Sequence, residues 1–348
     1  MNINSIPRRL GAVIVVLGSI MPVAGCYEWQ AISGQISLLR KREPIAAILA
    51  NPATPPPVRS QLQAVSAIRD FASRELGLPD NGSYRGYADI ERSYVVWNVF
   101  AAPEFSVEPK RWCYPVVGCV AYRGYFAERD ARRLAARLSA AGDDVAVRGA
   151  SAYSTLGTFD DPVLSTMLGW SDIDLAGIIF HELTHQLLYV PGDASFNEAL
   201  ATLVEGEGVR RWLRAQHREH DLAGYEARQQ RYAQVSGILL DSRRELRALY
   251  ASGADRETMR QGKREILDSL RRDYRRLRAG WPGDAGFDAW FDADLNNAQL
   301  VSVATYQSCL PGLARELAAL HGDLPAFYRR AQTLAKLPAV RRDALVCH

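Results

Sequence analysis

The stretch that decides the fold is HELTH, residues 181–185, which directly follows an apolar run over residues 175–180. On a helix, residues four apart lie one above the other, so His181 and His185 can offer two ring nitrogens to one Zn²⁺. Glu182 follows the first histidine and can flank the ion without binding it. In this motif the carboxylate is a general base that takes a proton from water and passes it to a leaving amine. The pattern predicts a catalytic zinc site.

The helix that carries this motif has start and stop signals of its own. Ser171 with Asp174 three residues later forms a capping box, and Pro191-Gly192 ends the helical pattern. We therefore expect a helix over residues 172–190. The two histidines could be ordinary helix residues, but this spacing around a glutamate has few structural uses in so apolar a helix.

A third ligand is expected from the next segment, a helix over residues 195–217. Glu198 stands 13 residues after the second histidine of the motif, and a turn through residues 191–193 would point it at the metal. Two histidines and one glutamate leave a fourth position open for water, as a catalytic zinc requires. Two alternatives remain open. Ser195 and Glu198 also form a capping box, and Glu205, on nearly the same helical face, is the rival ligand or a supporting or substrate-binding carboxylate.

The composition is that of a globular protein. The chain has 348 residues, of which 48% are hydrophobic and 23% charged, so it can bury a large core in one elaborate domain or two. Its net charge of +3 is too small for this length to suggest a nucleic-acid partner. We therefore expect a folded protein that does not bind nucleic acid.

The N-terminus has the pattern of an export signal. Two arginines precede an apolar stretch, residues 10–23, that is too short to span a bilayer, so residues 1–25 are expected to be a signal peptide. The stretch ends in VAGC, which resembles a bacterial lipobox in which Cys26 is lipidated and becomes the mature N-terminus. A plain secretory signal is the alternative. Because Tyr rather than Asp follows the cysteine, we expect a lipoprotein that faces the periplasm from the outer membrane, held by its lipid anchor.

The other four cysteines form an even set, as expected of an exported protein. Cys113 and Cys119 flank a short segment with Pro and Gly that can close a loop, so we predict a disulfide between them. Cys309 and Cys347 then form the second disulfide by remainder. No CxxC spacing is present, which argues against zinc binding by cysteines.

The element pattern predicts an α+β fold, with a small N-terminal sheet region and a predominantly helical, zincin-like metallopeptidase body. Residues 26–83 have helical periodicity, including one helix over residues 28–48, and residues 84–162 are rich in β-branched and aromatic runs. Residues 163–348 are mostly helical. Within them, residues 221–279 predict a long antiparallel helical hairpin of mixed charge, which is a solvated surface or a protein-binding arm.

The segment just before the metal helix, residues 152–162, has the pattern of an edge strand followed by a turn. In zinc peptidases an edge strand at this place commonly pairs with the substrate backbone, so the segment is a candidate for peptide binding. The alternative is a strand and turn with structural aspartates.

Several separate stretches together resemble a family of bacterial proteins, often lipoproteins, that are described as predicted aminopeptidases. The resemblance covers most of the mature chain and implies a zinc peptidase of the cell envelope. The stretches are residues 110–126, residues 153–162, the HELTH helix, FNE at residues 196–198 and NNA at residues 296–298.

The likeness to better-known zinc peptidases with two histidines and one glutamate is narrower. It is limited to the HELTH motif and the dipeptide Asn197-Glu198. The gap from His185 to Glu198 is shorter than those enzymes usually show, and the Gly-x-Met-x-Asn element, by which one large aminopeptidase group recognises an amine, is absent. These departures concern the preferred substrate end and leave the zinc chemistry unchanged.

The expected reaction assigns roles to the remaining candidates. Tyr153 and Tyr306 could donate a hydrogen bond to the developing oxyanion, because each lies in a block of the family resemblance. Asp160 or Glu205 could hold the α-ammonium of an aminopeptidase substrate. We therefore expect a zinc-dependent hydrolase of peptide bonds, most simply an aminopeptidase. An envelope endopeptidase or quality-control protease, and a non-catalytic envelope scaffold protein, are the alternatives.

Overall fold

The structure, a computed structural model, describes residues 25–114, 118–283, 286–304 and 309–347. Helices make up most of it, and together with small sheets they confirm the predicted α+β class. The helices are α1 (Gly25–Arg40), α2 (Ile45–Ala50), α3 (Pro56–Arg74), α4 (Glu128–Ala140), α5 (Asp172–Leu187), α6 (Ala194–Ala215), α7 (Glu219–Tyr250), α8 (Arg256–Ala279), α9 (Asp288–Asp292), α10 (Asn297–Ala304), α11 (Leu310–Ala319), α12 (Leu324–Ala335) and α13 (Ala339–Val346).

The strands form three small sheets among the described residues. The first sheet has the order β1-β2-β8, the second β6-β3-β7, and β4 pairs with β5 alone. In the second sheet the central strand β3 runs antiparallel to both neighbours. The strands are β1 (Arg42–Pro44), β2 (Gly86–Ala88), β3 (Val96–Pro103), β4 (Trp112–Tyr114), β5 (Gly118–Val120), β6 (Tyr122–Tyr125), β7 (Asp143–Ala150) and β8 (Val163–Leu164).

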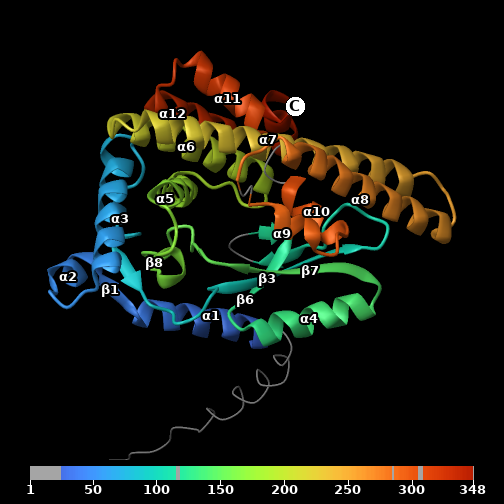
Figure 1. The fold of residues 1–348 in the computed structure, drawn as a ribbon, viewed down its shortest axis with the longest axis horizontal. Coiled ribbons are helices and arrows are strands. Elements are labelled where there is room, and N and C mark those ends of the chain that lie inside the picture. The colour runs from blue at the N-terminus through green and yellow to red at the C-terminus, as the bar shows by residue number, and fades with distance from the viewer. Residues whose placement is uncertain (1–24, 115–117, 284–285, 305–308, 348) are drawn as a thin grey trace, which may run out of the picture.

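The sheet β6-β3-β7 separates two layers of helices (Figure 1). Below it lie α1 and α4, and above it lie α10 and the long pair α7 and α8. Helices α5 and α6 pack against each other and against α3. Their apolar faces form the main core, in which Phe180 of α5, Phe196 of α6 and Phe327 of α12 are fully buried.

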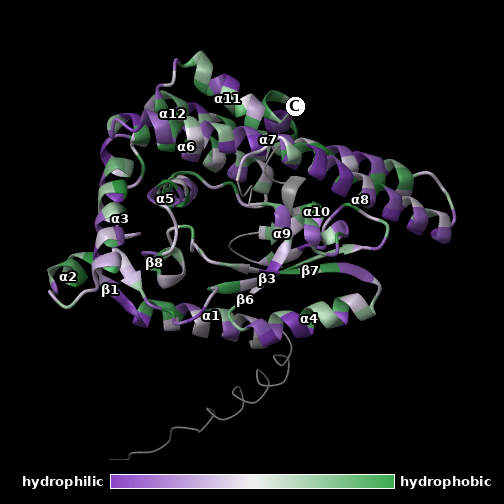
Figure 2. Ribbon diagram, viewed as in Figure 1, coloured by the Kyte–Doolittle hydropathy of each residue, from purple (hydrophilic) through white to green (hydrophobic). Residues whose placement is uncertain are grey.

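The predicted hairpin is confirmed as α7 and α8, joined by residues 251–255. Leu239 and Leu246 of α7 meet Leu267 and Leu270 of α8 in a second hydrophobic cluster. Hydrophilic residues cover the rest of α8 (Figure 2). The predicted helix over residues 28–48 is wrong: α1 ends at Arg40, a short strand follows, and α2 begins at Ile45.

The proline at position 44 explains that break. A proline disfavours helical backbone in the residue before it and cannot donate the next helical hydrogen bond. Residues 42–44 instead pair with residues 86–88 of β2 in an antiparallel ladder.

Residues 152–162 do not form the predicted edge strand. Strand β7 ends at Ala150, and the chain then runs through a loop and turns until β8 begins at Val163. The buried carboxylate of Asp161 holds this loop by accepting hydrogen bonds from Thr155 N (2.8 Å) and Ser154 Oγ (3.2 Å). Side chain to backbone bonds of this kind compete with a strand ladder, which agrees with a structural aspartate rather than an extended substrate-binding edge.

Both predicted disulfides are confirmed. Cys113–Cys119 joins β4 to β5, and Cys309–Cys347 ties the start of α11 to the residue after α13. Within the described ranges, none of the helices combines the length and the apolar character needed to cross a bilayer.

Candidate metal centre

The helix that carries the motif begins at its predicted cap and ends slightly early. Ser171 Oγ accepts a hydrogen bond from Asp174 N at 3.1 Å, and α5 ends at Leu187 rather than at residue 190. The helix packs closely on α6 because Gly208 carries no side chain. A Cβ at that position would lie 2.7 Å from Phe180 Cδ2, so the glycine sets the distance between the two helices.

The turn between α5 and α6 is locked by Asn197. Its Oδ1 accepts a hydrogen bond from Val190 N, and its Nδ2 donates one to Val190 O, both at 2.8 Å. Asn197 is buried, so these two bonds fix the first turn of α6 against the end of α5. Glu198 is the next residue, and its position depends directly on this lock.

Asp193, not Ser195, caps the N-terminus of α6. Asp193 Oδ1 accepts from Phe196 N at 3.0 Å, and its Oδ2 pairs with the buried guanidinium of Arg342. The capping-box alternative for Glu198 is therefore wrong, because the helix begins at Ala194 and already has its cap. The carboxylate of Glu198 is free to face the two histidines.

Three donor atoms converge on one point. His181 Nε2 lies 3.1 Å from His185 Nε2, and the two oxygens of Glu198 lie 3.4 and 3.7 Å from these nitrogens. A tetrahedral zinc with bonds of about 2.0 to 2.1 Å needs donor atoms about 3.3 Å apart. The three observed separations fall on both sides of that value, so the residues fit a single ion. They form a His-His-Glu cluster that could bind a metal.

Glu205, the rival ligand, lies on the other side of the His181 ring. Its Oε2 is 3.0 Å from His181 Nδ1, whereas the cluster uses the Nε2 atom of the same ring. Gly177, one turn before His181, leaves room for this contact, since a Cβ there would lie 3.2 Å from Glu205 Oε1. A carboxylate on the far ring nitrogen fixes the tautomer and the orientation of a ligating histidine.

The electrostatics of the cluster favour a positive charge at its centre. Burial alone would lower the pKa of His181, but its hydrogen bonds with Glu198 and Glu205 raise it well above its ordinary value. Burial and the charge of His181 lower the pKa of His185 to about 4. Burial would raise the pKa of Glu198, but the hydrogen bond with His181 and the charges of both histidines lower it. Glu198 and His185 are therefore held as a carboxylate and a neutral imidazole, the forms that bind a cation, and a bound cation would displace the proton from His181.

Glu182 stands beside the cluster without belonging to it. Burial raises its pKa to about 7, while the charge of His181 and a hydrogen bond with Ser154 oppose the rise and the charge of Glu198 adds to it. A carboxyl group that titrates near neutral pH can both accept and donate a proton during a reaction.

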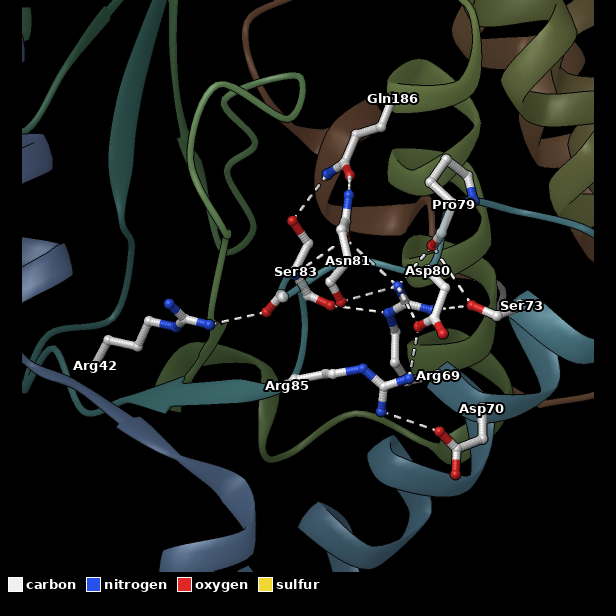
Figure 3. Close-up of polar contacts among 11 residues, drawn as sticks. Arg42, Arg69, Asp70, Ser73, Pro79, Asp80, Asn81, Ser83, Arg85 and Gln186 are labelled. Atoms are coloured by element: carbon white, nitrogen blue, oxygen red, sulfur yellow. Dashed lines mark hydrogen bonds and ion pairs between the residues drawn. The ribbon is translucent and has the colours of Figure 1, made fainter.

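A buried arginine on α3 organises the loop beside the site (Figure 3). Arg69 is fully buried, and its guanidinium donates to Ser83 O at 2.9 Å, Pro79 O at 2.6 Å and Ser73 Oγ at 2.5 Å. Burying a charge without water costs free energy unless its hydrogen bonds are satisfied. These contacts therefore fix residues 79–83 against α3.

The same loop is hydrogen-bonded to α5 and, through Asp161, to Ser154, whose hydroxyl contacts Glu182. Asn81 Nδ2 donates to Gln186 Oε1 at 2.8 Å, and Gln186 Nε2 donates to Ser83 Oγ at 3.2 Å (Figure 3). Ser83 Oγ also accepts from the backbone of Asp161, whose carboxylate holds Ser154. A continuous set of hydrogen bonds thus runs from the buried arginine to the hydroxyl that contacts Glu182.

Tyr84 adds a strained residue to this side of the site. Its backbone has φ 60°, in the left-handed region, and its ring is buried. Such strain in a bulky residue costs about 1 to 3 kcal/mol and persists only where the surroundings enforce it. Burial and then the charges of Glu182 and Asp161 raise the pKa of Tyr84 well above its ordinary value, and a hydrogen bond with Ser154 opposes the rise.

The two predicted oxyanion donors have different outcomes. Tyr306 lies outside the described residues. Tyr153 packs on Phe126, and its pKa is raised to about 12 by burial and by the charge of Asp161. Tyr122, which begins β6, is a third candidate: although the residue is 41% exposed, burial around its hydroxyl and then the charges of Glu198 and Glu182 raise its pKa.

Asp160, the other candidate for binding a substrate amine, pairs with Arg42 at 3.6 Å.

A comparison with protein families identifies the family of the whole chain. A family model described as "Putative aminopeptidase" matches residues 26–346. The chain belongs to this family. No curated protein and no solved structure matches the chain.

In this aminopeptidase-family chain, the sequence motif identified the metal cluster but not its surroundings. Tyr84, Tyr122 and Ser154 come from loops and a strand far from the motif, and no spacing rule connects them to it. The asparagine before Glu198 was visible in the family resemblance. Its role as the lock of the helix turn follows only from its hydrogen bonds to Val190.

Proposed function

We propose that this protein is a zinc-dependent peptidase of the cell envelope and, within that class, an aminopeptidase. The observation that carries the proposal is the convergence of His181, His185 and Glu198 at separations that suit one tetrahedral ion, with Glu182 beside them. Membership of the family supports the peptidase class. The donor set of two imidazoles and one carboxylate is typical of catalytic zinc.

Zn²⁺ held by these three residues would supply a Lewis acid that polarises the scissile carbonyl and makes a nearby water more acidic. Glu182 takes the proton from the attacking water and delivers it to the leaving amine. Its pKa of about 7 suits a group that must do both, and a bound cation would shift the balance toward the carboxylate. Glu205 keeps the ring of His181 oriented through its Nδ1 atom.

Tyr122 is the proposed donor to the oxyanion. A tyrosine hydroxyl is protonated at neutral pH, and the charges of Glu198 and Glu182 act on that of Tyr122, so the group can donate a hydrogen bond where negative charge develops. Tyr84 and Ser154, on the other side of Glu182, are proposed to hold that carboxylate in place.

The aminopeptidase assignment is supported by the family. It requires a substrate with a free α-ammonium group and a residue that binds this group. Glu205 is occupied by His181, and Asp160 by Arg42, so neither supports the assignment as an amine anchor. Peptides with free and N-acetylated ends decide the matter. An aminopeptidase cleaves only the free ones, whereas equal cleavage of both would show an endopeptidase.

The envelope location is proposed from the lipobox at Cys26. Radiolabelled palmitate should be incorporated into the wild-type chain and not into a Cys26→Ser variant. If both chains carry equal label, or neither does, the lipid anchor is excluded.

Glu182→Gln tests the chemical mechanism. We expect peptide hydrolysis to fall by about 10² to 10⁴-fold, the usual contribution of a general base, while zinc content stays unchanged. Glu226→Gln, at an exposed carboxylate 3.9 Å from Arg210, is the matched control and should keep full activity. If Glu182→Gln hydrolyses peptides at the wild-type rate, Glu182 is not the base.

A further inference from the structure

Helix α1 is attached to the body by one of its faces. Gln30 Nε2 donates to Gly124 O at 3.4 Å, and its Oε1 accepts from Phe126 N at 3.2 Å. Gly34 lies directly against Phe126, since a Cβ there would be 2.2 Å from that ring. Leu38 is buried on the same side. These positions are three to four residues apart and so share one face of the helix.

The opposite face of α1 is apolar and exposed. Trp29, Ile32 and Ile36 are 70%, 52% and 43% exposed. Their spacing of three and four residues places them in a single stripe along the helix. Single exposed apolar residues are ordinary on protein surfaces, but a stripe of large ones marks a site of interaction.

A basic helix, α4, lies next to the start of α1 on the same side of the sheet. Tyr27 of α1 packs on the hydrophobic cluster that includes Ala131 and Leu134 of α4, and both helices lie below the sheet in Figure 1. Arg129, Arg132 and Arg133 of α4 have side chains that are 81%, 66% and 63% exposed, and they pair with Asp130 or Glu128 of the same helix. With Arg137, α4 has four arginines against these two acids and keeps an excess of positive charge.

We propose that the exposed stripe of α1 and the arginines of α4 together bind the surface of an anionic lipid bilayer. A tryptophan and two isoleucines suit the boundary between headgroups and acyl chains, and neighbouring arginines suit anionic headgroups. The order of the chain supports this occupant, because α1 starts at the lipobox, whose Cys26 is proposed to carry the lipid anchor, and to that extent the inference rests on the proposed envelope location. The proposal is independent of the peptidase chemistry.

This arrangement would orient the whole molecule. In Figure 1, α5 and α6 lie above the level of α1 and α4. With the lower face on a bilayer, α5 and α6, which carry the His-His-Glu cluster, would be held away from the lipid.

The fluorescence of Trp29 tests the proposal at the residue that carries it. The full chain with Cys26→Ser, which cannot be lipidated, is mixed with vesicles of phosphatidylethanolamine and phosphatidylglycerol whose acyl chains are brominated. The emission of Trp29 is the difference between this protein and the same protein with Trp29→Phe. We expect that emission to move to shorter wavelength and to be quenched by the bromine atoms.

Two variants and one control make the test specific. Ile32→Ser with Ile36→Ser should reduce the quenching of Trp29 and weaken vesicle binding by about tenfold or more. Arg129→Gln with Arg132→Gln and Arg133→Gln should weaken binding only to vesicles that contain phosphatidylglycerol. Val340→Ser with Leu345→Ser, at positions of α13 that are 82% and 52% exposed, should change neither. All of these proteins keep residues 10–23, so their differences report on the two helices.

Three results would overturn the proposal. Trp29 emission could stay unquenched in protein that sediments with the vesicles. Trp29 could already be shielded from iodide in dilute solution, which would mean that the preceding segment of the chain covers the stripe. Its emission could instead change with protein concentration alongside a dimer in sedimentation, which would mean that a second copy covers it.

Discussion

In the proposed metal centre, Glu205 acts through the ring of His181 rather than as a ligand. Its carboxylate is 3.0 Å from His181 Nδ1, and Gly177 provides the space for that contact. Glu198, by contrast, is within 3.7 Å of both ligating nitrogens. Two glutamates on one helix therefore have separable roles, one on each side of the same imidazole.

Removing the charge of Glu205 should weaken zinc binding without abolishing it. We expect Glu205→Gln to lower zinc affinity by about 10 to 100-fold, the usual effect of losing the partner of a ligating histidine. Peptide hydrolysis should return when zinc is added, because the three donors remain. Competition with a fluorescent chelator measures the affinity. An unchanged affinity would contradict the positioning role, and a loss that no zinc concentration restores would make Glu205 a ligand.

Tyr122→Phe tests the proposed oxyanion donor. The ring and its packing on Phe100 are kept while the hydroxyl is lost, so kcat should fall by about 10 to 1,000-fold with little change in KM. Tyr153→Phe is the matched control, because that ring packs on Phe126, and it should stay near the wild-type kcat. The reverse pattern, with Tyr153→Phe as the inactive variant, would assign the role to Tyr153, one of the two donors predicted from the sequence.

At the residue scale, the sequence predicts what is local in the chain. His181, Glu182 and His185 follow from helical spacing alone. Glu198 needs the turn geometry, which depends on hydrogen bonds between Asn197 and Val190. The tyrosines and the serine around Glu182 come from distant segments, so only the tertiary structure brings them to the site.

Helices α5 and α6 act as one unit, and their spacing is set by small residues. Gly208→Ala would place a methyl group 2.7 Å from Phe180 and 2.8 Å from Leu76, so overpacking should lower the free energy of unfolding by about 1 to 3 kcal/mol. Gly224→Ala, on α7 where nothing lies within 4 Å, should instead raise it by up to about 1 kcal/mol. Urea unfolding followed by circular dichroism measures both. Equal stability of the two variants would contradict the close packing.

The hairpin α7 and α8 is attached to the sheet through Glu104, just after β3. Its carboxylate accepts hydrogen bonds from Arg256 at 2.5 Å and Arg260 at 2.6 Å. The hydrogen bond with Arg260 lowers the pKa of Glu104, burial opposes it, and the charges of Arg260 and Arg256 add to it. A carboxyl with a lowered folded pKa stabilises the protein above its unfolded pKa, about 4.3, and this contribution is lost as the pH falls through the folded pKa.

The attachment therefore predicts a pH-dependent stability difference. At pH 7, the free energy of unfolding of Glu104→Gln should be about 1 kcal/mol lower than that of wild type. The difference is modest because the ion pair is partly solvated. The difference should shrink as the pH falls below about 4.3 and vanish once the pH is below the folded pKa of Glu104. Glu257→Gln, at a carboxylate 75% exposed on α8, should have the same free energy of unfolding as wild type at every pH. A difference for Glu104→Gln that persists at low pH would show that charge is not its source.

At the element scale, long periodic helices are predictable and short irregular segments are not. The hairpin and the pair α5 and α6 agree with their predicted bounds to within a few residues. Residues 28–48 do not form one continuous helix, because pairing with β2 competes with helix formation at Pro44. The loop at residues 152–162 has the composition of a strand, but its buried Asp161 makes local hydrogen bonds that exclude one.

Across the whole molecule, both ends of the described chain pack on the body. Arg342 near the C-terminus pairs with Asp193 at the start of α6, and the Cys309–Cys347 disulfide fixes the helices around it. At the other end, α1 closes one face of the sheet and presents the stripe proposed to meet a bilayer. The fold class could be predicted from the sequence, whereas these long-range contacts could not, because no local pattern specifies which distant residues meet.

The central claim is that one ion is shared by three side chains. Elemental analysis of the purified chain after dialysis against zinc tests it most directly, with Glu198→Ala beside Glu205→Gln in saturating zinc. The account predicts about one zinc per chain for wild type and for Glu205→Gln, and close to none for Glu198→Ala, because two histidines alone do not complete a tight site. Full zinc content in Glu198→Ala, or no zinc in wild type, would contradict it.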